Sequence, residues 1–338
     1  MKKLIVFLGL IAMGIAQSCS NEIVLNEDWK DITIIYGLLD ASDSVQYIRI
    51  EKAFLDENTS ALILAQEGDS LFHENINVSL QAISESGQGG GFLPIERVDA
   101  NAEGLQKEEG VFATAPNYVY KVTEEMKPSF IYKLIIEKGD GGTETETITD
   151  VIGDFDITFP LVSSSNFIRF ESNRTQRFTW KPEEDAAFYD VMLRMNYLEA
   201  NVSDPDNFTA KSADWVMAQN IIRQPGESVN RLFQVEIDGA NYYKWVQSEL
   251  EEGDFIRELV DFDLFIYAGG VELDNYINAG RVSSGLTSVE ILPTYTNVTN
   301  GLGIFSTRYT KTEIGLLPNG RMLDTLATGP YTRNLGFR

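Results

Sequence analysis

The stretch "RFTWKPEEDAAFYDVMLRMNY", residues Arg177 to Tyr197, contains the clearest folding signal in this chain of 338 residues. Before its proline, Phe178 and Trp180 alternate with polar residues. After the acidic turn, large apolar side chains recur at every second position: Tyr189, Val191, Leu193, Met195 and Tyr197. Successive side chains of a strand point to opposite faces, so this period of two predicts two half-buried strands around a turn.

This arrangement resembles the B and C strands of an immunoglobulin-like or fibronectin type III-like sandwich, in which a tryptophan anchors the core. Similar strand patterns occur earlier in the chain: a strand pair around a turn at Asp40 to Asp43, an alternating strand in "NINVSLQAI" (Asn75 to Ile83), and a hairpin around Gly139 to Gly142. "SGQGGGF" (Ser86 to Phe92) is typical of a flexible loop. The sequence therefore predicts a mainly β fold with two β-sandwich-like domains.

The second half of the chain also contains helical patterns. Asn241 to Glu252 and Val271 to Arg281 have the spacing of short helices, and Gly280 is a stop signal for the latter. The strand pattern breaks at "FPLVSSSN" (Phe159 to Asn166). We therefore expect an N-terminal β-sandwich-like domain over residues 31–160. A C-terminal fibronectin III-like β domain with helical insertions is expected over residues 161–338.

The N-terminal segment has the features of a signal peptide. Leu4 to Ala16 is an apolar run that, as a helix, would span roughly 20 Å, short of the roughly 30 Å of a bilayer core. Residues 1–18 fit a cleaved signal. Its end, followed by the single cysteine, Cys19, resembles a bacterial lipoprotein signal. That resemblance implies acylation of Cys19, with residues 19–30 as a tether. The alternative is an ordinary secretory signal cleaved near Ser18.

The charge of the chain excludes one class of partner. It has 27 Lys and Arg against 51 Asp and Glu, a net charge of −24. Nucleic-acid binding needs a basic surface, so we expect no nucleic-acid partner. The hydrophobic fraction of 43% favours a packed globular protein over a disordered one.

A segment near the end of the chain carries a second resemblance. "YTNVTNGLGIFSTRY" (Tyr295 to Tyr309), the early "YGLLDASDSVQYIRI" and the central "YKLII" (Tyr132 to Ile136) resemble segments of uncharacterised Bacteroidota outer-membrane lipoproteins. The resemblance implies a lipid-anchored place at the cell outer membrane, with the surface or periplasmic face left open. It also implies a TonB-dependent transporter or another envelope protein as partner. Secreted proteins of this phylum are O-glycosylated at Asp-Ser/Thr-apolar triplets, which here place the candidate sites at Ser44, Ser70 and Thr325.

The chemistry of common active sites is poorly represented. His73 is the single histidine, and no nucleophile motif lies near it, so we interpret it as an exposed loop or strand-edge residue. Zinc needs several His or Cys ligands. Asp204, Asp206 and Asn207 could hold calcium but fit an ordinary turn better. We predict no catalytic residue, no metal and no cofactor. Four rings could form either a sugar-binding platform or core: Trp215, Tyr242, Tyr243 and Trp245.

These observations favour a non-enzymatic, lipid-anchored envelope protein that binds a ligand or partner beside an outer-membrane nutrient uptake system. Two alternatives stay open at this stage. One is a surface adhesion or structural lipoprotein built on the same sandwiches. The other is a glycan-binding or glycan-active protein. A carboxylate pair does not decide this alternative, because with 51 acidic residues a pair of suitable separation arises by chance.

Overall fold

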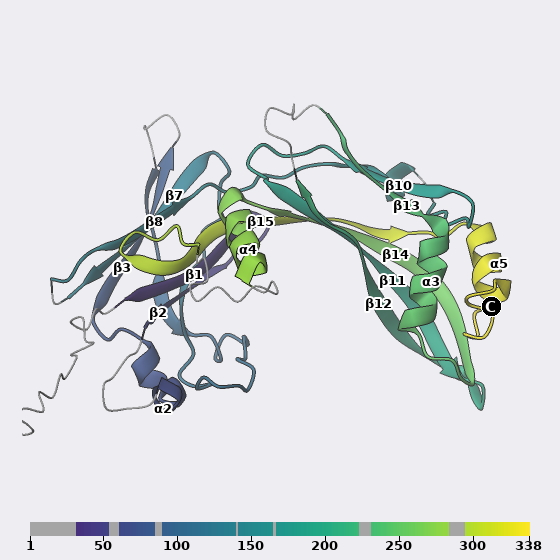
Figure 1. The fold of residues 1–338 in the computed structure, drawn as a ribbon, viewed down its shortest axis with the longest axis horizontal. Helices are drawn as coiled ribbons and strands as arrows, with labels where there is room; N and C mark the ends of the chain where they lie inside the picture. The colour runs from purple at the N-terminus through teal and green to yellow at the C-terminus, as the bar shows by residue number, and fades with distance from the viewer. Residues whose placement is uncertain are drawn as a thin grey trace, which may run out of the picture. The chain divides into compact units, whose positions relative to one another are not determined.

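The computed structural model describes residues 32–53, 61–84, 90–139, 141–164, 167–222, 231–283 and 295–338. The predicted signal peptide, the tether and Cys19 lie outside these residues. Within them the chain is mainly β, with several sheets and a few short helices (Figure 1), which confirms the predicted fold class.

The largest sheet has eight strands in the order β12-β11-β14-β15-β1-β2-β6-β5. Its strands are β1 (Thr33–Asp40), β2 (Gln46–Lys52), β5 (Glu96–Asp99), β6 (Tyr118–Val122), β11 (Phe188–Asn201), β12 (Asp204–Ile222), β14 (Phe255–Gly269) and β15 (Gly301–Leu316). Two smaller sheets have the orders β4-β3-β7-β8 and β13-β10-β9. Their strands are β3 (Ile76–Ser84), β4 (Gly90–Leu93), β7 (Phe130–Lys138), β8 (Thr145–Thr149), β9 (Ile157–Phe159), β10 (Thr175–Trp180) and β13 (Phe233–Asp238).

The described helices are short. They are α2 (Ala61–Gln66), α3 (Gly239–Glu249), α4 (Val271–Ser283) and α5 (Gly320–Thr328), with 3-10 turns η1 (Gly68–Leu71) and η2 (Val162–Ser164). The predicted helices at 241–252 and 271–281 are confirmed as α3 and α4, but the predicted stop at Gly280 is wrong, because α4 continues to Ser283. Asp238 caps α3, because its side chain accepts a hydrogen bond from the Ala240 amide at 2.9 Å. None of the helices in the described ranges combines the length and apolar character that crossing a bilayer requires.

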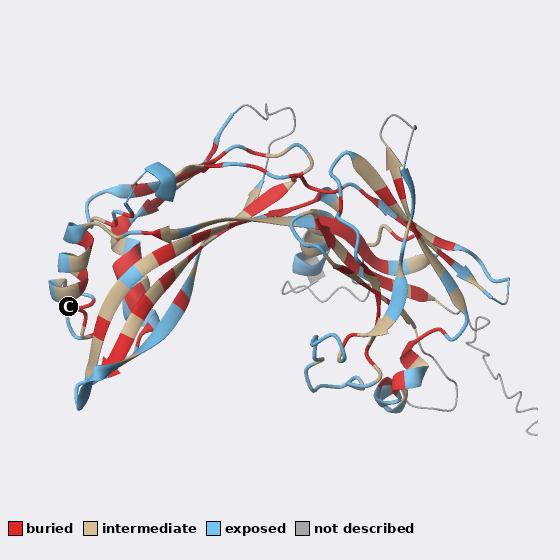
Figure 2. Ribbon diagram, turned by 180° about the vertical axis from the view of Figure 1, so that it is seen from behind, coloured by how far each residue is buried: buried red, intermediate tan, exposed pale blue. Residues whose placement is uncertain are grey.

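One hydrophobic core, the aromatic core, lies between β10, β11, β14, α3 and α5. Phe178 and Trp180 are fully buried in it, as the alternation predicts. On β11 the inward residues are buried at every second position, and Figure 2 shows this alternation along the long strands. Phe170 and Tyr242 stack with ring centroids 4.6 Å apart, and Trp180 meets Tyr189 at 5.4 Å.

A second hydrophobic core, the aliphatic core, lies between β1, β2 and β6 of the large sheet and the sheet of β3, β7 and β8. Ile35, Leu39, Ile48, Leu80 and Leu134 are fully buried in it. The strands predicted in this half are confirmed, with β1 and β2 paired around the turn at 40–43. The prediction of a loop over 86–92 is wrong in part, because Gly90–Leu93 forms β4, which pairs with β3. The first four residues of that predicted loop lie outside the described residues.

β15, the last strand in sequence, contributes to both cores. β15 pairs parallel to β1, from Thr33 opposite Gly301 to Asp40 opposite Arg308, and antiparallel to β14. Phe305 is buried in the aliphatic core, whereas Leu316 is buried in the aromatic core. The predicted boundary at residue 160 stays a prediction, but β15, which follows it in sequence, completes the core of the first half.

The segment "NVTNGLGIF" (Asn297 to Phe305) sets the conformation of the chain at the start of β15. The side chain of Asn297 bonds both the amide and the carbonyl of Phe305, at 3.0 and 2.7 Å. Asn300 and Gly303 have φ values of 57° and 102°, the left-handed region that favours Asn and Gly. A Cβ on Gly303 would lie 2.0 Å from the Ile35 carbonyl oxygen, so glycine lets β15 approach β1.

Candidate functional site

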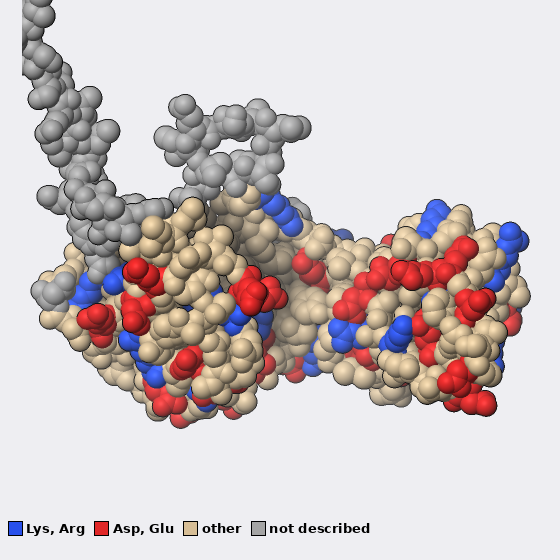
Figure 3. Space-filling model, turned by 90° about the horizontal axis from the view of Figure 1, so that it is seen from below, with Lys and Arg blue, Asp and Glu red and all other residues tan. Residues whose placement is uncertain are grey.

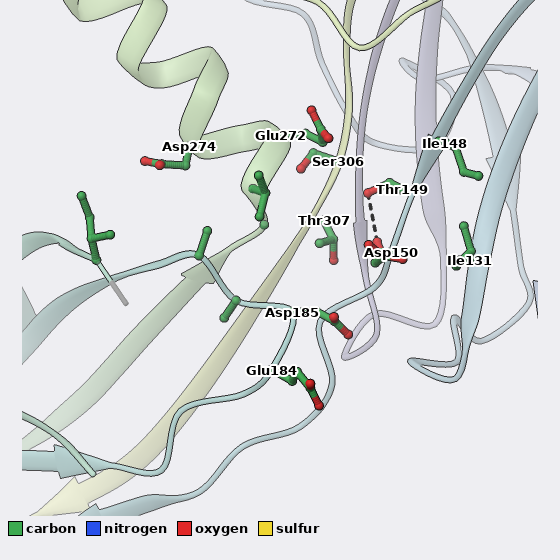
Figure 4. A pocket seen from close by; sticks show the side chains of 15 residues that line it. Ile131, Ile148, Thr149, Asp150, Glu184, Asp185, Glu272, Asp274, Ser306 and Thr307 are labelled. Carbon is green, nitrogen blue, oxygen red and sulfur yellow. Dashed lines mark hydrogen bonds between the residues drawn. The ribbon is translucent and has the colours of Figure 1, made fainter. Parts of the chain in front are cut away.

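A cavity of about 580 Å³ lies where four segments meet: the end of β8, the loop at 184–187, the first turn of α4 and the middle of β15. Ligand sites in proteins are concave and lined by apolar side chains with a few polar groups. This cavity combines apolar side chains with a larger share of polar ones, many of them carboxylates, and we call it the acidic pocket. Its lining residues are Ile131, Ile148, Thr149, Asp150, Glu184, Asp185, Ala186, Ala187, Ile222, Gly270, Val271, Glu272, Asp274, Ser306 and Thr307 (Figure 4).

Hydrogen bonds fix α4 against β15 at the base of the acidic pocket. The Ser306 hydroxyl accepts from the Leu273 amide at 3.1 Å, and the Thr307 carbonyl accepts from the Gly270 amide at 3.0 Å. Both β15 side chains are buried. A Cβ on Gly270 would lie 2.7 Å from the Thr307 methyl group, so glycine permits this close approach. The wall made by α4 is therefore set by the register of β15.

Thr307 also joins this wall to the first half of the chain. Its hydroxyl donates to the Leu39 carbonyl at 3.1 Å and accepts from the Ile152 amide at 3.0 Å. These bonds link β15 with the end of β1 and with the segment after β8. One buried hydroxyl thus holds three segments that are remote in sequence, which places the Asp150 region beside α4.

Carboxylates surround the acidic pocket. They come from separate parts of the chain: Asp150, Glu184, Asp185, Glu272 and Asp274. No Lys, Arg or His is among the lining residues of the described chain. Glu184 and Asp185 belong to the turn that the sequence indicated as solvated, and Glu184 is indeed exposed. The pocket therefore offers negative charge and hydrogen-bond acceptors, a setting that attracts cations.

Glu272 reports the electrostatic character of the site most directly. Burial raises the pKa of its carboxyl group, and the nearby charge of Asp150 raises it further. The Tyr295 hydroxyl donates a hydrogen bond to its Oε2. A bound cation would favour the ionised form of this carboxyl group and so counteract both effects.

Apolar side chains supply the rest of the lining. Ile148, Ile222 and Val271 are exposed by 49%, 44% and 58%. Large exposed apolar groups that converge on a cavity favour a ligand with an apolar part. Among the described residues, no group of three His, Cys, Asp or Glu side chains has a geometry that could hold a metal ion. The chemistry of the pocket suits an organic cation.

The structure corrects the interpretation of His73. It is 6% exposed rather than on the surface, and its Nε2 lies 3.3 Å from the Thr33 hydroxyl. Its carbonyl accepts a hydrogen bond from Arg97 at 3.2 Å. Ala65, Leu71 and Phe72, near it in sequence, are buried as well. The sequence signal failed here because polar neighbours in "DSLFHEN" hid a buried segment.

The four candidate platform rings belong to the aromatic core. Tyr242 and Tyr243 are buried, and the Tyr243 hydroxyl donates to the Phe170 carbonyl. Trp215 and Trp245 are half-buried and stack on each other at 5.4 Å, so one face of each ring is covered by the other ring. Asp204 and Asn207 lie at the exposed start of β12, where the Asn207 amide donates to the Asp204 carboxylate at 3.3 Å. Neither group belongs to the acidic pocket.

The three candidate glycosylation residues differ in accessibility. Ser44 is exposed in the turn between β1 and β2. Ser70 is in η1, and its hydroxyl donates to the carbonyls of Leu64 and Glu67 at 2.5 and 2.6 Å. Thr325 is in α5, and its hydroxyl donates to the Arg321 carbonyl at 2.8 Å. Of the three, Ser44 presents its hydroxyl most openly. Cys19 lies outside the described residues.

Comparisons with known proteins leave the chain without a family. No family model matches it, and no curated protein matches it. Among solved structures, it is similar to the C-terminal globular domain of an oligosaccharyltransferase from Pyrococcus abyssi. The sequence identity is 11% and the TM-score 0.22, and the match covers 67% of this chain and 45% of that one. A similarity of this size carries no argument about function.

Proposed function

We propose that this chain is a non-enzymatic binding protein of the cell envelope, anchored through an acylated Cys19, that takes an organic cation in the acidic pocket. The observation that carries the ligand class is the set of five lining carboxylates with no lining cation in the described chain. Burial and the nearby charge of Asp150 both raise the pKa of Glu272, and the second of these effects supports a negative potential at the site.

The envelope part of the proposal rests on the sequence. Its support is the apolar run before Cys19 and the resemblance to outer-membrane lipoproteins of Bacteroidota. One acyl chain gives marginal membrane binding, so stable anchoring needs the several chains of a lipoprotein cysteine. A protein of this kind would act beside a TonB-dependent transporter at the outer membrane.

The non-enzymatic part is supported by the position of the groups that could do chemistry. The single histidine is buried against Thr33, and the lining of the acidic pocket does not include it. A general base must lie within hydrogen-bond reach of the proton that it removes. The lining carboxylates instead provide charge for holding a cation.

Calorimetric titration of the full chain in detergent, with a detergent blank, tests the ligand class. Tryptamine and indole-3-acetate are suitable probes because they share a ring and carry opposite charges. We expect tryptamine to bind and Glu272→Gln to weaken it about tenfold, the effect of losing one charge-assisted hydrogen bond. Glu96→Gln, on the exposed strand β5, is the matched control. Equal tryptamine affinity in all three proteins would exclude the acidic pocket as the site.

Two cell experiments test the proposed lipid anchor and the proposed partner. Metabolic labelling with palmitate should mark the wild-type chain and not Cys19→Ser. A label that persists in Cys19→Ser refutes the anchor. Affinity purification from native membranes should recover a TonB-dependent transporter or another envelope protein. Recovery of the anchored chain alone would count against the accessory role and favour the adhesion alternative.

A further inference from the structure

A second cavity, of about 440 Å³, lies on the opposite face of β1 and β2 from the aliphatic core. Residues of the core, such as Ile35 and Ile48, alternate with those that line this cavity. Tyr36 lies opposite Arg49 of β2 on one side and opposite Ile304 of β15 on the other. Directly opposed residues share a face of the sheet, so these three side chains form one surface.

Apolar groups cover most of this cavity. Leu38, Val119 and Ile304 line it from the strands, and Leu105 lines it from the loop before β6. Tyr36 and Leu105 are 43% and 47% exposed, although they face a concave surface. Exposed apolar groups of this kind mark binding grooves, because a ligand that covers them removes apolar area from water.

Two cations stand beside these apolar groups. Arg49 donates to the Asn117 side-chain oxygen at 2.6 Å and pairs with Glu51 at 3.3 Å. Asn117 is 2% exposed and donates in turn to the Asn101 side chain at 3.0 Å. The guanidinium is therefore held in place by a buried amide that also fastens the loop carrying Lys107.

Lys107 supplies the second charge. Burial lowers the pKa of its ammonium group, Glu51 opposes this shift, and Arg49 adds to it. Within the described part of the chain, no carboxylate lies within ion-pair distance of this ammonium. The ammonium nitrogen lies over the ring of Phe112, 5.5 Å from the ring centroid. Glu51 offsets the charge of Arg49, so the cavity keeps about one positive charge in a strongly acidic protein.

We propose that this cavity is a second binding site, for a small organic carboxylate whose apolar ring or chain rests on Tyr36, Leu38 and Leu105. Its carboxylate pairs with Lys107 and with the guanidinium of Arg49. The carboxylate gives an anionic partner to a partly buried ammonium, and the apolar body covers the exposed lining. The site has the opposite ligand preference to the acidic pocket, and neither depends on the other.

Calorimetric titration of the full chain in detergent, with a detergent blank, tests the site with indole-3-acetate, 4-phenylbutyrate and octanoate. We expect at least one of the three to bind. Lys107→Met keeps most of the aliphatic side chain but removes the charge, and it should weaken the binding of that probe about tenfold. Lys107→Arg should restore most of the affinity. Lys133→Met, which removes a cation paired with Glu146 on the other sheet, is the matched control and should change nothing.

Several results would overturn the proposal. The first is that none of the three carboxylates binds at millimolar concentration. The second is that neither Lys107→Met nor Arg49→Gln changes the affinity for the bound probe. The third is that Lys133→Met lowers this affinity as much as Lys107→Met does. Thermal midpoints of all variants, measured in parallel, separate loss of the site from loss of the fold. Glu272→Gln distinguishes the two sites, because it should lower the affinity for tryptamine and leave the affinity for the carboxylate probe unchanged.

Discussion

The aromatic core and the aliphatic core share the large sheet, but their strands come from different distances along the chain. In the aromatic core, β11 pairs with β12, which follows it directly, and with β14. In the aliphatic core, β1 pairs with β15, and the Thr307 hydroxyl reaches the Leu39 carbonyl across 268 positions of sequence. The aromatic core therefore contains strands that are neighbours in sequence, whereas the aliphatic core requires β1, at the start of the described chain, to pair with the distant strand β15.

The largest expected effect comes from breaking that long-range contact. In Gly303→Ala the new Cβ would meet the Ile35 carbonyl oxygen at 2.0 Å, and φ of 102° is unfavourable for alanine. We expect a loss of more than about 4 kcal/mol in the free energy of unfolding, because two paired backbones must separate. Gly315→Ala, at φ of 83° with no atom within 4 Å, is the control and should cost about 1 kcal/mol.

Urea unfolding of both variants measures the difference. Equal losses would show that conformational strain alone matters and that β15 can move away from β1 at little cost. A loss of near-ultraviolet signal from the aromatic core in Gly303→Ala, at a urea concentration where the wild type is folded, would show that the two cores unfold together.

The distance along the chain also explains what the sequence could predict. Alternation between Phe178 and Tyr197 predicted two strands and the buried Trp180, because that signal lies within the strands themselves. The helices α3 and α4 followed from spacing in the same way. Nothing within "GLGIFSTRY" indicates that β15 lies parallel to β1, because pairing between distant strands leaves no local pattern.

The acidic pocket could not be predicted for the same reason. Asp150, Glu184 and Glu272 lie on three separate segments, and each is an ordinary acidic residue in a chain that has 51 of them. Thr307 joins the Asp150 segment to the start of α4, because its hydroxyl accepts from the Ile152 amide and its carbonyl accepts from the Gly270 amide. A single threonine in a strand gives no warning of that role. His73 was placed wrongly because burial depends on the packing of η1, which the sequence did not show.

The next largest effect on stability is expected at a buried ion pair beside the aromatic core. Arg257 is 2% exposed and donates to Glu199 at 2.7 Å and to the Leu335 carbonyl at 2.7 Å. Arg257→Met leaves the buried Glu199 carboxylate with Lys211 as its remaining cationic partner, so we expect a loss of about 3 kcal/mol in the free energy of unfolding. The double variant Glu199→Met with Arg257→Met should recover part of it. Urea unfolding measures both, and a double variant no better than the single one would contradict this account.

A smaller effect is a pH dependence of the same cluster. Burial raises the pKa of Glu199, but hydrogen bonds and charges from Lys211 and Arg257 outweigh it, so the pKa lies below its ordinary value. A depressed pKa stabilises the fold above the unfolded value of about 4.3 and loses this contribution as the pH falls through the folded value. The stability difference between wild type and Glu199→Gln should therefore be larger at neutral pH than in acid. Unfolding at a series of pH values tests this, and a constant difference would contradict it.

The smallest effect is expected at the residue that anchors the aromatic core. The indole nitrogen of Trp180 is buried and has no hydrogen-bond partner among the described residues. A buried donor left unpaired costs about 1–3 kcal/mol, so Trp180→Phe removes that penalty while it also removes ring volume packed against Tyr189 and Phe233. The two terms oppose each other, and the net change should stay within about 1 kcal/mol. Tyr243→Phe is the control, because it deletes a hydroxyl whose partner, the Phe170 carbonyl, would then be left unpaired. Thermal and urea unfolding should rank Tyr243→Phe as the more costly change, and the reverse order would show that ring volume outweighs hydrogen bonding in this core.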